Sequence, residues 1–438
     1  MRTLRLSPVL WMPAVGMLLL SAPADVLAVE APGVFAGRVL DATTGNPIGD
    51  ALVTVGNTVS RTDGEGAFRI TGVGETLSVR AVGYRRAALP AADLAGRSTT
   101  LRLPPLSVKA LYLSVYGIGN RGMRTAALKL LRETELNALV IDVKGDKGLI
   151  PFKTTIPLAL ETGAHAVTTV RDMPELMQSL RGRGVYLIAR IVVFKDTPLA
   201  LARPGWAIRT HDGEIWRDRE NLAWVDPFQK DAWSHTIDIA VEAARIGFDE
   251  IQFDYIRFPD TGGLVFSQPS TEERRVRAIS EFLAAARSAL VPYNVFLAAD
   301  VFGYVLWNSN DTFIGQKLEA LPEQLDYLSP MLYPTTFQFG IPGHRRPVED
   351  PYAIVFKSLQ NARLRLHLPP VRFRPWLQAF RDYAFDRRQF GGAQIRDQIT
   401  AAEDFGSNGW MLWNPLNQYA DEGLSKWPGK REAAVGGQ

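Results

Sequence analysis

The chain has 438 residues, of which 46% are hydrophobic and 22% charged, and its formal net charge is +3. This length and composition allow a large buried core and more than one domain. Acidic and basic residues nearly balance and no basic run stands out, so we expect no nucleic-acid partner. The absence of cysteine and of an H-E-x-x-H pattern excludes disulfides and thiolate metal sites. We therefore expect neither a metal nor a cofactor, with an oxygen-ligated Ca²⁺ site as the open alternative.

The first 28 residues predict a secretory signal peptide. Arg2 and Arg5 precede the apolar stretch 9–20, and small residues follow it. We place cleavage after Ala28, with cleavage after Ala24 as the alternative. An uncleaved anchor is the competing interpretation, which the shortness of the apolar run disfavours. The prediction is an exported protein, periplasmic or extracellular, without a membrane span once the signal is removed.

The next segment, residues 33–104, has the pattern of a small all-β domain. Short apolar runs alternate there with turn clusters at 43–47, 63–66 and 72–75. The strings GRVLDATTGNPIGDALVTV and LSVRAVGYRRA resemble the carboxypeptidase regulatory-like domain, which implies a transthyretin-like sandwich of accessory function. We expect no catalysis in this domain. Two consecutive prolines then predict a short, stiff linker at 103–106.

The remaining segment, residues 107–425, alternates strands with helices. Eight apolar runs have the length of buried strands, namely 110–115, 138–143, 185–193, 250–253, 295–300, 327–332, 371–379 and 409–413. Apolar strands separated by helices favour a parallel sheet covered on both faces, and eight of them favour a closed barrel. A doubly wound sheet is the alternative, but no G-x-G-x-x-G follows the first strand. The predicted fold class is α/β, a (β/α)8 TIM barrel preceded by a small all-β transthyretin-like sandwich.

Binding residues of such a barrel are expected where the strands end, because the carboxyl ends of the strands form the mouth. Polar and aromatic side chains recur there and in the loops beyond. We predict substrate contacts for Tyr116, Asp142, Lys144, Arg190, Trp216, Arg257, Tyr333, Gln378 and Trp413. Sugar rings pack on indoles, which favours the tryptophans. Each residue could instead be a helix cap or a core residue, and core packing is our interpretation of Trp376.

The most specific hypothesis assigns a catalytic role to two carboxylates. Asp254 ends an apolar strand, and Asp300 ends the next one. Neighbouring strands lie about 4.8 Å apart, so the two carboxyl groups could lie roughly 5 to 8 Å from each other, a range suited to glycoside hydrolysis. We assign Asp254 as nucleophile or base and Asp300 as general acid. The alternative is a structural ion pair of the first carboxylate with Arg190, Lys144 or Arg257.

Motifs along the large domain resemble a known family. The stretches ALVIDVKGDKGLIPF, GFDEIQFDYIRFP, LDYLSPMLYPTTF and GWMLWNP, between residues 108 and 419, are similar to a bacterial glycosyl hydrolase-like domain family of unknown function, a distant relative of α-amylase-type barrels. The resemblance implies action on polysaccharide, with a nucleophile at Asp254 and an acid after the fifth strand. The chain departs from α-amylases at three positions. Gln252 stands where arginine is usual, Asp300 where glutamate is usual, and Gln378 where α-amylases have an acid at the end of the seventh strand. We therefore do not expect α-amylase specificity.

Two functions are compatible with these observations. The first is hydrolysis or transglycosylation of a bacterial extracellular or envelope polysaccharide through the carboxylate pair. The second is a non-catalytic barrel that binds carbohydrate. A polysaccharide or oligosaccharide is the expected partner in both. Carboxylates that meet at one mouth would favour hydrolysis, whereas diverging or salt-bridged carboxylates would favour binding.

Overall fold

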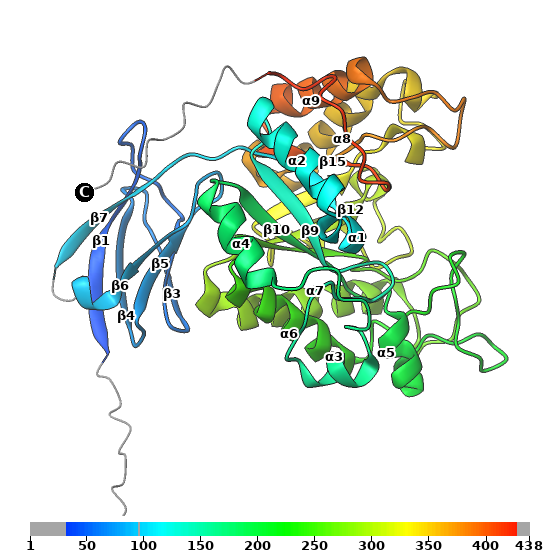
Figure 1. Ribbon diagram of the computed structural model, residues 1–438, viewed down its shortest axis with the longest axis horizontal. Coiled ribbons are helices and arrows are strands. Elements are labelled where there is room, and N and C mark those ends of the chain that lie inside the picture. The colour runs from blue at the N-terminus through cyan, green and yellow to red at the C-terminus, as the bar shows by residue number, and fades with distance from the viewer. Residues whose placement is uncertain (1–31, 95–96, 427–438) are drawn as a thin grey trace, which may run out of the picture.

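The computed structural model describes residues 32–94 and 97–426, which form a β-sandwich followed by a larger α/β barrel (Figure 1). The predicted signal peptide, residues 1–28, lies outside the described residues. None of the helices in the two described ranges combines the length and the hydropathy of a membrane span.

The sandwich consists of two sheets that enclose a small core. One sheet has the strand order β4-β1-β7 and the other β3-β2-β5-β6. Their bounds are β1 (Gly33–Asp41), β2 (Leu52–Val55), β3 (Thr58–Arg61), β4 (Ala67–Gly72), β5 (Thr76–Arg80), β6 (Ala87–Pro90) and β7 (Ser98–Leu103), with a 3-10 turn, η1 (Ala91–Asp93), after β6. Phe35 and Val39 of β1 are buried while their neighbours face outward, as the two-residue period of a strand requires. The predicted all-β sandwich is confirmed, and its relation to carboxypeptidase regulatory-like domains stays a prediction.

The barrel closes through eight parallel strands in sequence order. These are β8 (Val108–Leu113), β9 (Ala138–Lys144), β10 (Tyr186–Val192), β11 (Glu250–Asp254), β12 (Phe296–Phe302), β13 (Tyr327–Met331), β14 (Trp376–Gln378) and β15 (Gly409–Trp413). The predicted TIM barrel is confirmed. The seventh strand is shorter than the predicted 371–379, because residues Pro370–Arg372 form a 3-10 turn, η8.

Helices surround the barrel (Figure 1). The α-helices are α1 (Val115–Gly119), α2 (Arg121–Glu133), α3 (Pro157–Thr162), α4 (Met173–Gly182), α5 (Thr197–Ala202), α6 (Lys230–Ile246), α7 (Glu272–Leu290), α8 (Pro351–Leu366) and α9 (Gly392–Phe405). Further 3-10 turns are η2 (Pro204–Trp206), η3 (Val291–Tyr293), η4 (Gly303–Leu306), η5 (Leu318–Ala320), η6 (Pro334–Thr336) and η7 (Pro347–Glu349). Side chains such as Asn120 and Asp172 accept hydrogen bonds from the first turns of α2 and α4, which explains where these helices begin.

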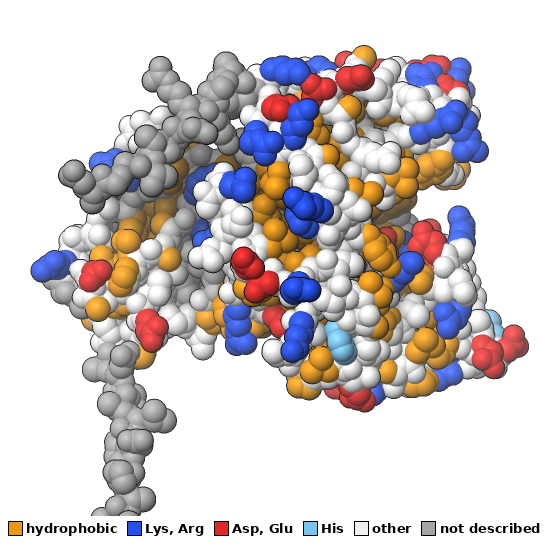
Figure 2. All heavy atoms as spheres, viewed as in Figure 1, with side chains coloured by type: hydrophobic (Ala, Val, Ile, Leu, Met, Phe, Trp, Pro, Cys, Tyr) orange, Lys and Arg blue, Asp and Glu red, His pale blue; other side chains and the backbone are white. Residues whose placement is uncertain are grey.

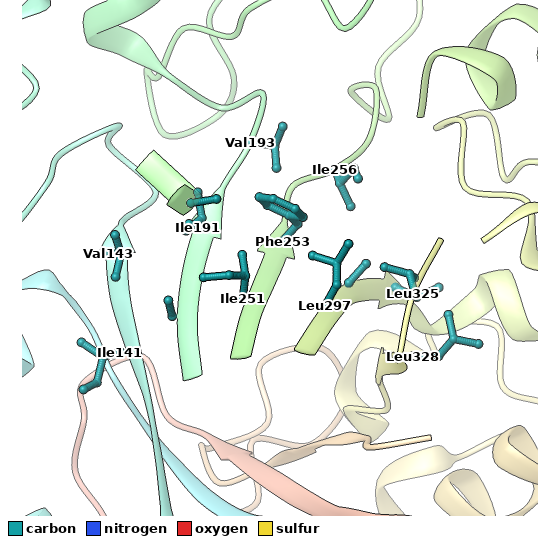
Figure 3. Packing of buried hydrophobic residues seen from close by; sticks show 14 of the residues in the cluster. Ile141, Val143, Ile191, Val193, Ile251, Phe253, Ile256, Leu297, Leu325 and Leu328 are labelled. Atoms are coloured by element: carbon teal, nitrogen blue, oxygen red, sulfur yellow. The ribbon is translucent and has the colours of Figure 1, made fainter. Parts of the chain in front are cut away.

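Alternation along the strands separates two cores. Ile191, Phe253 and Leu297 point outward and pack in the layer between strands and helices, as Figure 3 shows. The intervening residues point into the barrel, where Tyr186 and Ala298 belong to a second cluster. Because the strands are parallel, their inward residues form layers, and the layer at the carboxyl ends lines the mouth.

The sandwich docks on the opposite end of the barrel, where the strands begin. Arg86 donates to Asp249 (3.1 Å) and to the carbonyls of Phe248 (2.9 Å), Tyr293 and Asn294 (both 3.3 Å), all next to the starts of β11 and β12. The backbone N–H of Gly83 donates to the hydroxyl of Tyr327 on β13 (3.0 Å). The mouth is therefore left open on the side away from the sandwich, where Figure 2 shows a hollow at the right edge of the molecule.

Replacing Arg86 by Ala should destabilise this junction. Four hydrogen bonds would be lost and the largely buried Asp249 would lose its counter-ion, so we expect the free energy of unfolding to fall by about 2–4 kcal/mol. Urea unfolding measures the change. Arg85→Ala is the matched control, because that neighbour donates only one long bond, to Gly184 (3.4 Å). Equal stability of the two variants would contradict the prediction.

Candidate active site

Arg190 is the centre of the charged network at the mouth. It lies on β10, is 1% exposed, and its guanidinium contacts three carboxylates. Its Nη1 donates to Asp142 (2.7 Å), its Nη2 to Asp146 (2.9 Å), and its Nε and Nη2 donate to the same oxygen of Asp254 (2.9 and 2.6 Å). Burial alone would lower the pKa of Arg190, but the three carboxylates raise it well above its ordinary value. The guanidinium is a permanent cation that fixes the positions of the acids.

Asp142 supports Arg190 from the neighbouring strand β9. Its second oxygen accepts a hydrogen bond from the hydroxyl of Tyr112 (2.7 Å). Burial, opposed by Arg190 and reinforced by the charge of Asp146, raises the pKa of Asp142 to about 6. With 2% of its surface exposed, Asp142 orients the guanidinium and does not form part of the open surface of the mouth, so the structure does not support its predicted substrate contact.

Asp254 ends β11 and reaches the open space of the mouth with 10% of its side chain exposed. Its Oδ2 accepts both bonds from Arg190, and its Oδ1 accepts the backbone N–H of Tyr255. Tyr255 has φ +48°, in the left-handed region that a bulky residue rarely adopts. The backbone therefore turns sharply directly after Asp254. Such strain occurs where the surrounding structure holds a functional side chain in place.

Asp300 lies on the adjacent strand β12, at the same level of the barrel. Phe253 pairs with Ala299, one residue before each acid, so the two carboxylates are neighbours across the strand boundary. Oδ1 of Asp300 accepts a bond from the indole Nε1 of Trp376 (2.7 Å), and its buried Oδ2 has no hydrogen-bond partner among residues 32–94 and 97–426. Burial, and then the charge of Asp254, raise the pKa of Asp300 well above its ordinary value. Asp300 thus retains a proton beside an ion-paired Asp254.

Three aromatic side chains pack together next to Asp300 and Arg190. Tyr112 and Trp413 stack with ring centroids 3.9 Å apart, and Trp376 meets both edge-on at 6.3 and 5.5 Å. The guanidinium of Arg190 lies 4.9 Å from the ring centre of Trp413. Burial, followed by the charges of Asp300 and Asp254, raises the pKa of the Tyr333 hydroxyl well above its ordinary value. Trp413 keeps part of its surface open, as a sugar-stacking residue requires.

Three other predicted residues lie in the loops beyond the strand ends. Tyr116, on α1, is 50% exposed. Arg257 is half-buried, and its guanidinium lies 5.1 Å from the ring of Trp224 and 5.3 Å from that of Tyr255. Trp216 is half-buried and tilted against Trp224, with ring centroids 6.1 Å apart. The packing around Trp224 links Arg257 and Trp216 to Tyr255, the residue that follows Asp254.

The barrel is assigned to a family by comparison with known proteins. The model of the family described as "Putative glycosyl hydrolase domain" matches residues 110–419. The chain belongs to this family. No curated protein matches the chain. The relation to α-amylases stays a prediction.

Solved structures also resemble this member of the glycosyl hydrolase domain family. A hypothetical protein from Ruminiclostridium thermocellum ATCC 27405 is 38% identical over 44% of this chain and 97% of its own, with a TM-score of 0.39. The glycoside hydrolase domain of PgaB (BpsB) from Bordetella bronchiseptica is 15% identical over 71% of this chain and 94% of its own (TM-score 0.49). That of PelA from Pseudomonas aeruginosa is 12% identical over 71% and 96% (TM-score 0.40). Neither a sugar nor a catalytic residue follows from these similarities.

The structure of this family member does not support the predicted substrate contact of Lys144. The strand β9 contains a β-bulge, since Asp142 pairs with Arg190 but Lys144 pairs with Ile191. The extra residue, Val143, turns Lys144 to the outside of the barrel. There it is fully buried and forms a 2.6 Å ion pair with Asp196. The predicted contact is wrong because a residue at a strand end reaches the mouth only if its side chain also faces the barrel axis, and the bulge turns Lys144 away from it.

Gln378 is also unavailable to a ligand. It is 0% exposed, its side-chain oxygen accepts the backbone N–H of Thr335 (3.0 Å), and its amide donates to the carbonyl of Phe380 (3.0 Å). The side chain of Gln378 thus bonds to the loop after β13 through its oxygen and to the loop after β14 through its amide nitrogen. The predicted substrate contact of Gln378 is therefore wrong as well.

Four contributors to the site are absent from the predicted catalytic and substrate-contact residues. These are Tyr112, Asp146, Tyr255 and Trp376. Tyr112 shares the inward face of β8 with Ala110, so strict alternation could have placed it. Trp376 does pack in the barrel interior as expected, but its bond to Asp300 needs three-dimensional information. No group of three His, Asp or Glu side chains suited to a metal occurs in the described ranges.

Arg190→Gln should destabilise the protein. The variant would leave the carboxylates of Asp142, Asp146 and Asp254 without their shared cation, and we expect the free energy of unfolding at pH 7.5 to fall by about 3 kcal/mol. The loss should shrink at pH 5, where the unpaired acids take up protons. Arg190→Lys, which keeps the charge, should recover part of the stability in the same urea titrations. A pH-independent loss would contradict this account.

Proposed function

We propose that the protein is a glycoside hydrolase acting on a bacterial extracellular or envelope polysaccharide, with Asp254 and Asp300 as its catalytic pair. The observation that carries the proposal is the contrast between two adjacent acids: one is ion-paired with Arg190, and the other is buried with a raised pKa and a free oxygen. Glycoside hydrolysis needs this contrast, because one carboxyl group must donate a proton while the other is ionised. Membership of the glycosyl hydrolase domain family points to the same reaction class.

In the proposed reaction, Asp300 transfers its proton to the glycosidic oxygen as the bond to the anomeric carbon breaks. Asp254 either attacks that carbon and forms a glycosyl ester, which water then hydrolyses, or removes a proton from the water that attacks. The first route retains the anomeric configuration and the second inverts it. In both, the positive charge that develops on the sugar faces the Asp254 carboxylate.

The proposed substrate contacts surround this pair. Trp413 supplies a stacking surface, and Tyr333 places a hydroxyl near both acids. Tyr116, Arg257 and Trp216 would contact sugar units further along the chain. The predicted signal peptide makes the periplasm or the cell exterior the proposed place of action.

A non-catalytic carbohydrate-binding barrel is the second candidate. The observation that favours it is the pair of hydrogen bonds from Arg190 to Asp254, since a salt-bridged carboxylate is what a purely structural acid would show. Both bonds fall on Oδ2, however, and Oδ1 receives only a backbone N–H. That oxygen keeps lone pairs for an anomeric carbon or a water.

The test is a screen of the purified protein against polysaccharides of bacterial cell envelopes and exopolysaccharides. Release of reducing ends by the wild type, and none by the double variant Asp254→Asn/Asp300→Asn, would support hydrolysis. Binding of the same polysaccharide by both proteins, without release by either, would replace the proposal with the binding function. NMR of the first product would then distinguish retention from inversion.

A further inference from the structure

A second pocket lies between the sandwich and the barrel, at the end opposite the mouth. Its volume is about 230 Å³, and both domains contribute charged side chains to it. Those from the sandwich are Asp50, Arg61 and Arg80, and those from the barrel are Arg287, Glu323, Asp326 and Arg372. Asp326 directly precedes β13, so this pocket is separated from Asp254 and Asp300 by the length of the barrel strands.

Arg80 is the unusual residue of this pocket. It ends β5 and is only 6% exposed, yet its buried Nε donates no hydrogen bond to any residue in the described part of the chain. Its nearest acid is Asp326, at 3.7 Å from Nε. A buried guanidinium nitrogen without a hydrogen-bond partner is costly, and structures of proteins rarely contain one.

Asp326 does not supply the missing bond, because its nearer oxygen lies 3.7 Å from Nε of Arg80. Its Oδ1 accepts a bond from Arg287 (3.2 Å), and its Oδ2 accepts the backbone N–H of Leu297 (2.9 Å). Arg372 donates its Nε and Nη2 to backbone carbonyls, among them that of Asp326 itself (2.8 Å). Three guanidinium groups, those of Arg80, Arg287 and Arg372, thus line the pocket beside one buried carboxylate.

The remaining acids do not balance this charge. Asp50 is exposed and pairs with Arg61, which is exposed as well (2.7 Å). Glu323 is exposed and forms no ion pair with any described residue. Burial, and then the opposing charges of neighbouring arginines, lower the pKa of Arg80 despite Asp326, as expected where a counter-ion is lacking. The inner part of the pocket therefore has an excess of positive charge.

We propose that this pocket binds a small oxyanion of the phosphate or sulfate class. The free N–H groups of Arg80 donate to the anion, and Arg287 and Arg372 supply the balancing charge. A tetrahedral oxyanion matches these donors because its oxygens accept several charge-assisted bonds at once. The volume of 230 Å³ also admits a phosphate monoester of a small molecule. Because Arg80 belongs to the sandwich and the other two arginines to the barrel, the anion binds the two domains together.

The wild-type protein tests the proposal directly. Calorimetric titration with inorganic phosphate, in a buffer held at constant ionic strength with chloride, should show saturable binding, and the unfolding temperature should rise by roughly 2 °C or more at saturation. Glucose 6-phosphate serves as a second ligand and glucose as its control. Tighter binding of the ester would identify a phosphate monoester as the ligand, and equal binding a free anion. Absence of saturable binding of both phosphate and sulfate would overturn the proposal.

Variants locate the site. Arg80→Gln should weaken phosphate binding by about tenfold or more, since it removes the unpaired donor. Arg102→Gln, an exposed residue of β7 outside the pocket, is the matched control and should bind like the wild type. If Arg80→Gln does not fold, the exposed Arg61→Gln replaces it, with a smaller expected loss. Equal affinities of the pocket variant and the control would show that phosphate binds elsewhere and would overturn the assignment.

Discussion

Asp254→Asn should lower the rate of polysaccharide cleavage by about 10³-fold or more while the protein remains folded. The amide has the shape of the carboxylate but cannot attack an anomeric carbon or remove a proton from water. Its single oxygen still accepts the hydrogen bonds from Arg190, whereas the amide nitrogen takes the place of the oxygen that accepts the backbone N–H of Tyr255. The variant therefore loses one local bond and keeps the contact that fixes the side chain. The measurement is reducing-end release, with circular dichroism and urea unfolding of the same preparation.

The control for this variant is Asp146→Asn, which removes another carboxylate from Arg190 at a half-exposed position. We expect it to retain most of the activity, because Asp146 is not part of the proposed acid pair. An active Asp254→Asn protein would end the catalytic proposal. Inactivity of both variants would mean that the charge balance around Arg190, and not a specific carboxylate, governs the reaction.

Asp300→Asn should lower the rate by about 10²- to 10⁴-fold and remove the alkaline limb of the pH profile. In the wild type, Asp300 must carry a proton to act, so activity should fall as the pH rises through its raised pKa. The variant cannot lose that proton, and its residual activity should lack this fall. Activity is followed between pH 4 and 9.

The same substitution should make the protein more stable, relative to the wild type, as the pH rises. The pKa of Asp300 is higher in the folded than in the unfolded protein, so the folded state is favoured at low pH and loses this advantage as the pH rises through the raised value. Relative to the wild type, Asp300→Asn should therefore gain stability as the pH increases. A constant difference in unfolding free energy from pH 4 to pH 9 would contradict the raised pKa.

The sequence was sufficient to predict the barrel because each strand is an apolar run that helical segments separate. The ends of those runs also identified Asp254, Asp300 and Arg190, since parallel strands bring their carboxyl ends to one side. These candidates required only the position at which each strand ends. That position alone is misleading at Lys144, because a bulge has no reliable sequence signal.

Contacts between distant segments were beyond sequence reasoning. Arg190 appeared as one of several polar residues, and only the fold shows that it holds three acids together. The bond from Trp376 to Asp300 joins residues 76 positions apart. Likewise, nothing in the pattern of the sandwich predicts that Arg86 docks on the start of β11. These features depend on packing, whereas the strands depend on local composition.

The bulge at Val143 decides which residues of β9 face the barrel axis. Upstream of it, even-numbered positions of β9 face the axis, and downstream the even-numbered Lys144 faces the surrounding helices. The bulge thus keeps the Lys144 ammonium group out of the cluster of acids around Arg190 and directs it to Asp196 instead. The same sequence paired without the bulge would point Lys144 into the mouth, so the pairing register alone sets the charge of the entrance, without any substitution.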